Sequence, residues 1–90
     1  MKLRAMEPLH AVATGPAEGT PVVFLHGFMG SLHDWDPIIA RLSHSVRCIA
    51  VDLPDHGQSR ASVDYDFDDV ARALDEVVRR FDCIRPVVVG

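Results

Sequence analysis

The residues best suited to chemistry form one short segment, His26-Gly27-Phe28-Met29-Gly30. This first turn follows the apolar run 22–25, as expected of a loop at the end of a buried strand. Carbonyl chemistry needs N–H donors fixed toward the oxygen that gains charge, and a backbone N–H in a glycine-opened turn is such a donor. We expect Gly27 to let the main chain approach a substrate, Phe28 to offer its N–H, and His26 to brace the loop. The alternative is that these residues only form a turn.

Two further apolar runs also end where a turn is expected. The run 46–51 leads into a second turn, Asp52-Leu53-Pro54-Asp55-His56-Gly57-Gln58-Ser59. The run 86–90 ends at Gly90. Three buried strands that carry special turns at their carboxyl ends describe the active-site edge of an open α/β sheet.

Other site chemistries do not fit these turns. A dinucleotide site needs G-x-G-x-x-G, whereas the first turn has the bulky Phe28 between two glycines. No turn ends in Gly-Lys-Ser/Thr, which excludes a phosphate-binding P-loop. The histidines lack the paired spacing of zinc sites and are scattered along the chain: His10, His26, His33, His44 and His56. We therefore predict neither a nucleotide cofactor nor a metal.

Composition narrows the class of protein. The chain has 90 residues, is 48% hydrophobic and 24% charged, and carries a formal charge of −4. This charge, without a basic cluster, argues against nucleic acid or anionic lipid as partner. There is no apolar run of membrane-spanning length, and the first eight residues lack the apolar core of a signal peptide. Cys48 and Cys83 give no disulfide framework, so reduced thiols and a cytoplasmic location are expected.

Two helices must connect the predicted strands. Apolar residues recur at helical spacing over 35–42 and again over 70–81, where acidic residues precede the helix and arginines end it. The resulting order of strand, helix, strand, helix, strand predicts a mostly parallel sheet with right-handed crossovers and helices on its faces. Two short segments around Pro8, residues 3–7 and 9–13, could add an antiparallel hairpin at the N-terminus.

Together the turns resemble the α/β-hydrolase fold. That fold has an oxyanion turn after one strand, a D-x-x-G-x-G-x-S turn after the next, and then the nucleophile elbow G-x-S-x-G. Gly90 matches the first glycine of the elbow, and the resemblance covers residues 21–90. It implies that residues 1–90 are the N-terminal part of a single α/β-hydrolase domain, truncated at the nucleophile elbow.

Within this superfamily the motifs look most like the 2-succinyl-6-hydroxy-2,4-cyclohexadiene-1-carboxylate synthase family of menaquinone biosynthesis. The resemblance implies a Ser-His-Asp triad that abstracts a proton and expels pyruvate from a small-molecule substrate, without cofactor or metal. It makes the Phe28 N–H the oxyanion donor. The residues that support the two turns would be His26, Gly27, Met29, Gly30, Asp52, His56, Gly57 and Ser59. A carboxylesterase or thioesterase of the same fold, or a non-catalytic binding or assembly module, stays open as an alternative.

The chain departs from the family pattern at Asp55, where glycine is usual and an unusual backbone angle is expected. Aspartate tolerates left-handed conformations better than most residues, so we expect a cost of about 1 kcal/mol rather than a different turn. A catalytic pair between His56 and Asp52 or Asp55 is disfavoured, because the resemblance makes these residues turn supports.

The triad residues of the family would all lie beyond Gly90, so we expect this chain alone to be inactive. The strand over 86–90 would neighbour the strand over 22–25 and would leave its other edge unpaired. An unpaired apolar edge invites association. We therefore expect the chain to self-associate or to pair with the missing C-terminal part.

Overall fold

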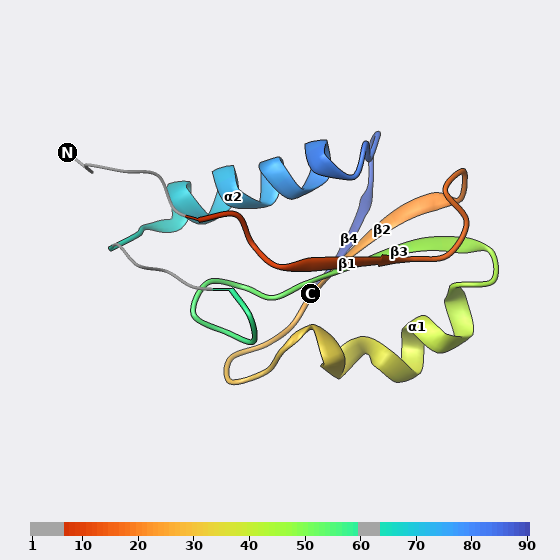
Figure 1. Ribbon diagram of the computed structural model, residues 1–90, viewed down its shortest axis with the longest axis horizontal. Helices are drawn as coiled ribbons and strands as arrows, with labels where there is room; N and C mark the ends of the chain where they lie inside the picture. Colours follow the sequence, from red (N-terminus) through yellow and green to blue (C-terminus); the bar gives the residue numbers. More distant parts are fainter. Residues whose placement is uncertain (1–6, 60–63) are drawn as a thin grey trace.

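The computed structural model describes residues 7–59 and 64–90. It contains four strands, a short 3-10 helix and two α-helices (Figure 1). In chain order they are β1 Ala11–Thr14, β2 Thr20–Leu25, η1 Leu32–Trp35, α1 Asp36–Leu42, β3 Val46–Val51, α2 Phe67–Arg80 and β4 Val87–Val89.

The strands form one mixed sheet in the order β1-β3-β2-β4. The pairs β2–β3 and β2–β4 are parallel, with Val23 opposite Ile49 on one side and Val88 on the other. The pair β1–β3 is antiparallel. The mostly parallel sheet predicted from the sequence is thereby confirmed, and β2, β3 and β4 all end at the same edge.

An antiparallel pair is present near the N-terminus, between β1 and β3, whereas the hairpin of residues 3–7 with 9–13 stays a prediction. β1 pairs with β3, with Ala11 opposite Val51, and the Asp52 N–H extends the ladder to the His10 carbonyl oxygen at 2.9 Å. Of the segment predicted to pair with it, residues 3–6 lie outside the described residues. Leu9 precedes the strand and is 1% exposed in the core.

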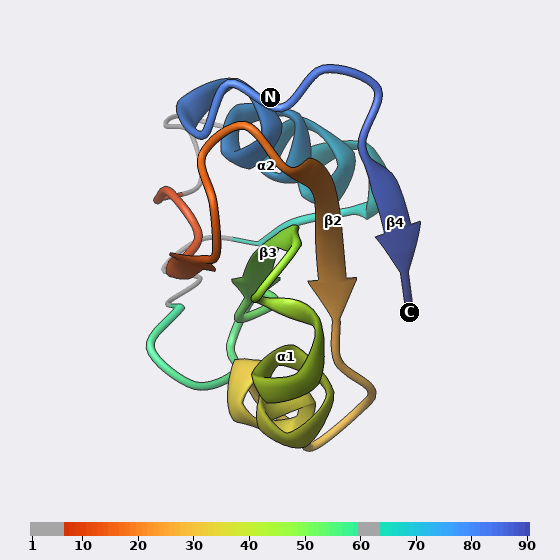
Figure 2. The same cartoon turned by 90° about the vertical axis from the view of Figure 1, so that its right-hand side faces the viewer.

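The sheet is covered on both faces. Helix α2 lies over one face, while η1 and α1 lie over the other (Figures 1 and 2). Side chains alternate between the two faces along each strand. On the α2 face, Val23, Ile49 and Val51 join Val77 of α2 in one buried cluster. On the opposite face the Phe24 ring packs on Trp35, with ring centroids 5.1 Å apart.

The two predicted helices differ in how closely they follow the prediction. Asp66 caps α2, and its side chain accepts a hydrogen bond from the Asp69 N–H, as the acidic start of the segment predicts. The segment 35–42 was predicted as one helix, but Trp35 belongs to η1 and α1 begins at Asp36. Ser31 and Asp34 form a reciprocal capping box that holds this start as a 3-10 turn.

Both cysteines are free and buried, and burial raises the pKa of each thiol. For Cys83 the nearby Arg47 opposes this shift without cancelling it. The thiolate is the reactive form, so we predict that iodoacetamide at neutral pH labels both residues at least about ten-fold more slowly in the folded chain than in denaturant. Mass spectrometry of timed samples measures this, and equal rates in the two conditions would contradict it.

Neither α-helix in the described part of the chain is long and apolar enough to cross a membrane. Among the same residues, no cluster of histidine, cysteine and carboxylate side chains could hold a metal ion.

Candidate functional site

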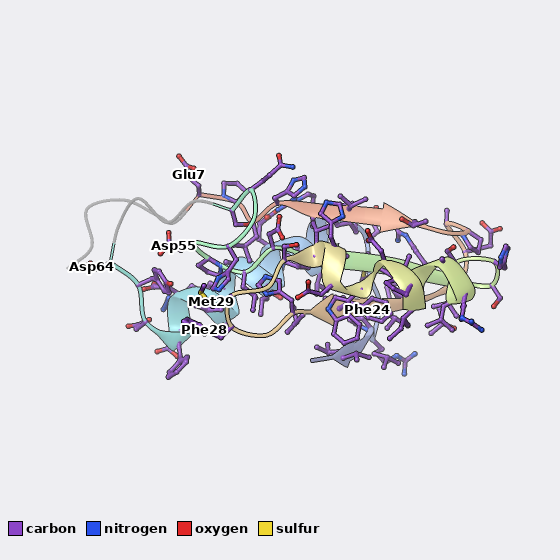
Figure 3. The ribbon with its side chains drawn as sticks, turned by 90° about the horizontal axis from the view of Figure 1, so that it is seen from below. Glu7, Phe24, Phe28, Met29, Asp55 and Asp64 are labelled. Atoms are coloured by element: carbon purple, nitrogen blue, oxygen red, sulfur yellow. The ribbon has the colours of Figure 1, made fainter. Side chains whose placement is uncertain are left out.

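The two turns and Gly90 lie at the carboxyl edge of the sheet. Figure 3 shows Phe28, Met29 and Asp55 together at one end of the molecule. Gly90 follows β4 beside the last residue of β2, since a Cβ built on it would lie 3.8 Å from the Leu25 Cβ. The strand order therefore brings together the three segments that the sequence singled out.

The first turn leaves the Phe28 N–H without an acceptor among the described residues. The Gly30 N–H donates to the Gly27 carbonyl oxygen at 3.1 Å, and Met29 has φ +67°, which together are typical of a type II turn. The Met29 N–H donates to Nε2 of His56 at 3.2 Å. Within residues 7–59 and 64–90 the Phe28 N–H donates to no acceptor, and a Cβ built on Gly27 would meet nothing within 4 Å. A free donor thus adjoins open space.

Gly30 has a packing reason of its own. A Cβ at this position would lie 2.1 Å from Oδ2 of Asp34, the carboxylate that accepts the Ser31 N–H. Phe28 and Met29 are 89% and 79% exposed, so burial of these residues contributes little to holding the turn.

His26 connects the first turn to the second. Its side chain is 6% exposed. Nδ1 lies 2.7 Å from the Gly27 carbonyl oxygen, and Nε2 accepts the Leu53 N–H at 3.0 Å. His26 thus makes hydrogen bonds to the backbone of both turns.

His56 makes backbone hydrogen bonds with both ring nitrogens. In addition to the Met29 N–H at Nε2, its Nδ1 lies 2.9 Å from the Pro54 carbonyl oxygen. The Asp52 carboxylate instead accepts the N–H groups of Leu32 and Gln58, at 2.8 and 2.9 Å. This arrangement does not favour a catalytic pair between His56 and Asp52.

Asp52 is the centre of the second turn, and it is buried, with 2% of the residue exposed. Gly57 packs directly on it at φ +52°, and a Cβ there would lie 2.3 Å from the carboxylate. Ser59 is also buried, and its hydroxyl donates to the Asp52 carbonyl oxygen and accepts the His10 N–H at 2.9 Å. Ser59 is therefore placed as a structural residue rather than as a nucleophile.

Asp55 adopts the left-handed conformation that its position predicts, with φ +64°. Its carboxylate accepts the Tyr65 hydroxyl at 3.5 Å. Sequence reasoning missed the same conformation at Met29, because methionine is not a residue type that marks it. It also missed the backbone donors of Leu32, Leu53 and Gln58, since a peptide N–H gives no signal in the residue type.

Comparison with known proteins decides the family. The model of the alpha/beta hydrolase fold family matches residues 20–90. The chain belongs to the α/β-hydrolase fold family. Its carboxyl-edge turns are therefore the turns of this fold, and the resemblance seen in the sequence is confirmed.

Curated relatives include more than one activity within this family. The 2-succinyl-6-hydroxy-2,4-cyclohexadiene-1-carboxylate synthase of Salmonella typhimurium is 37% identical over 83 residues, which cover 91% of this chain and 32% of that protein. The protein PHYLLO of Arabidopsis thaliana is 36% identical over 82% of this chain and 5% of its own length. A haloalkane dehalogenase of Mesorhizobium japonicum is 43% identical over 81% of this chain and 24% of its own length. The chain thus spans a third or less of these relatives.

Solved structures agree on the fold. A marine microorganism esterase superposes with a TM-score of 0.83 at 25% identity, covering 92% of this chain and 31% of that one. The protein Cfl2 from Burkholderia cenocepacia superposes with a TM-score of 0.80 at 34% identity, over 89% of this chain and 28% of its own.

Proposed function

We propose that this chain is the N-terminal part of a pyruvate-eliminating synthase of menaquinone biosynthesis, and that it supplies the oxyanion donor of the active site. The free N–H of Phe28, next to a Met29 N–H that His56 accepts, is the observation that carries the proposal. The synthase of Salmonella typhimurium, which matches 91% of the chain, supports the choice of reaction.

The proposed chemistry divides between this chain and the rest of the enzyme. A Ser-His-Asp triad outside residues 1–90 removes a proton from carbon, and the electron pair left behind drives the departure of pyruvate. Negative charge develops on a carboxylate or carbonyl oxygen of the substrate during this step. The Phe28 N–H stabilises that oxygen, and the two-turn scaffold keeps the donor in place without reorganisation.

Ester hydrolysis is the second candidate, favoured by the superposition on the marine esterase. An oxyanion turn serves both reactions, because each builds negative charge on an oxygen. The two candidates differ in the product that is released, pyruvate in one case and a carboxylic acid with an alcohol in the other.

A chimaera distinguishes these reactions. Residues 1–90 would replace the matching N-terminal third of the Salmonella typhimurium synthase, and the unmodified synthase would serve as control. We expect the chimaera to release pyruvate from the synthase precursor, and residues 1–90 alone to release none. A folded chimaera that hydrolyses p-nitrophenyl esters and releases no pyruvate would favour the esterase, and one without either activity would contradict both candidates.

We also propose that the free edge of β4 takes up a further strand. Val87 and Val88 of this three-residue strand are 52% and 59% exposed, and β4 lies at the end of the strand order (Figure 2). An apolar strand edge of this kind pairs readily with another chain. We predict that residues 1–90 associate as their concentration rises, and that adding residues C-terminal to the matching third of the synthase suppresses this. Sedimentation velocity measures it, and a monomer at every concentration would contradict it.

A further inference from the structure

His26 and His56 form a reciprocal connection between the two turns. His26, which belongs to the first turn, accepts the N–H of Leu53 from the second. His56, which belongs to the second turn, accepts the N–H of Met29 from the first. The two rings lie against each other, with centroids 4.9 Å apart and planes tilted by 55°.

The partners fix the protonation state of both rings. Each Nδ1 faces a backbone carbonyl oxygen, of Gly27 for His26 and of Pro54 for His56, and a carbonyl can only accept. Each Nε2 faces a backbone N–H, which can only donate. Both rings must therefore be neutral and carry their proton on Nδ1.

The hydrogen bond that His56 accepts helps to hold the backbone of Met29 in its conformation. A left-handed backbone is unfavourable for methionine, and Met29 at φ +67° is 79% exposed, so packing of its side chain does not hold it there. What holds the peptide are the Gly30-to-Gly27 bond and the acceptor that His56 presents to the Met29 N–H. Without this acceptor, the Met29 amide would be free together with the adjacent Phe28 amide.

We propose that His56 is the positioning residue of the oxyanion turn. By accepting the Met29 N–H it fixes the turn in the form that leaves the Phe28 N–H free for a substrate oxygen. It acts through the backbone of Met29 and does not touch the reacting atoms. The catalytic consequence rests on the proposed function, whereas the tautomer and the hydrogen bond do not.

The first test measures the tautomers directly. Long-range proton–nitrogen NMR spectra of the 90-residue chain, labelled with ¹⁵N-histidine, distinguish a proton on Nδ1 from one on Nε2. We expect the Nδ1–H form for His26 and His56, while exposed His44 serves as the internal control and shows the Nε2–H form that prevails in water. A proton on Nε2 of His56 at neutral pH would overturn the proposal.

The second test compares two substitutions at His56. The side-chain oxygen of glutamine can take the place of Nε2 as acceptor, whereas alanine offers none. We expect the Met29 amide to exchange slowly with solvent in the native chain and in His56→Gln, and about ten-fold or more faster in His56→Ala. The Phe28 amide exchanges fast in all three. Equal Met29 exchange in the native chain and in His56→Ala would overturn the proposal. If His56→Ala does not fold, His56→Leu takes its place. Slow Met29 exchange in His56→Gln with fast exchange in His56→Leu would then support the proposal, and equal exchange in the two would overturn it.

The chimaera supplies the catalytic test. We expect His56→Ala to lower kcat with little change in KM, and His56→Gln to restore most of kcat. Loss of kcat in both variants alike would refute the positioning role. If the unmodified chimaera releases no pyruvate, the proposed function fails, and the tautomer and exchange results still decide whether His56 holds the turn.

Discussion

Replacing Phe28 by proline in the chimaera is expected to lower kcat for pyruvate release by about 10²–10³-fold, the usual effect of removing one oxyanion donor. Proline has no N–H, so the substitution deletes the free donor of the first turn. It also fits the backbone, because Phe28 occupies the second position of a type II turn, where proline is favoured. The effect is therefore expected on kcat and not on folding.

The matched control is Phe28→Ala, which removes the aromatic ring and keeps the N–H. Phe28 is 89% exposed, and its ring packs edge-on with the His56 ring, with centroids 6.2 Å apart. We expect kcat of this variant to stay within about ten-fold of the unmodified chimaera. Steady-state kinetics measure both variants, and thermal melting confirms that they are folded. If alanine and proline lower kcat equally, the side chain rather than the N–H is the functional group.

Replacing Asp52 by alanine is expected to lower the free energy of unfolding by about 3–5 kcal/mol, since each hydrogen bond from an N–H to a carboxylate contributes about 1.5–3 kcal/mol. The Leu32 and Gln58 amides would lose their acceptor in a buried site. Asp52→Asn keeps the shape and one acceptor oxygen, but its NH₂ group would face the second amide. We expect this variant to lose about 1–3 kcal/mol.

Urea unfolding followed by circular dichroism measures these differences. The control is Asp75→Ala, which removes an exposed carboxylate that pairs with Arg79 at 2.9 Å within α2. An exposed pair of this kind contributes at most about 1 kcal/mol. If Asp52→Ala costs no more than Asp75→Ala, then Asp52 does not organise the second turn.

The sequence predicted those features of the fold that depend on residue type. The run 46–51 became β3 with the predicted bounds, because a strand covered on both faces needs apolar residues, and its last four residues are buried. The acidic cap at Asp66 and the basic end of α2 also followed from residue type. Asp55 was predicted to need an unusual backbone angle and has φ +64°.

The features that the sequence did not predict depend on hydrogen bonds and long-range contacts. The capping box of Ser31 and Asp34 divides the predicted helix into η1 and α1. β1 pairs with β3 although β2, η1 and α1 lie between them in the chain, and local patterns carry no information on such a partner. The two turns that the sequence singled out lie together at the carboxyl edge of the sheet, and their role as a site stays a prediction. The bonds that shape the turns, such as Leu53 to His26 and Met29 to His56, join backbone amides to side chains and could only be found in three dimensions.

A crystal structure of the chimaera with its product bound tests the oxyanion role of Phe28 most directly. The proposed function predicts a product carboxylate or carbonyl oxygen about 2.7–3.1 Å from the Phe28 nitrogen, with the Met29 N–H still bonded to His56. A product whose oxygens are all bound elsewhere, with the Phe28 N–H facing solvent or bonded within the chain, would contradict it.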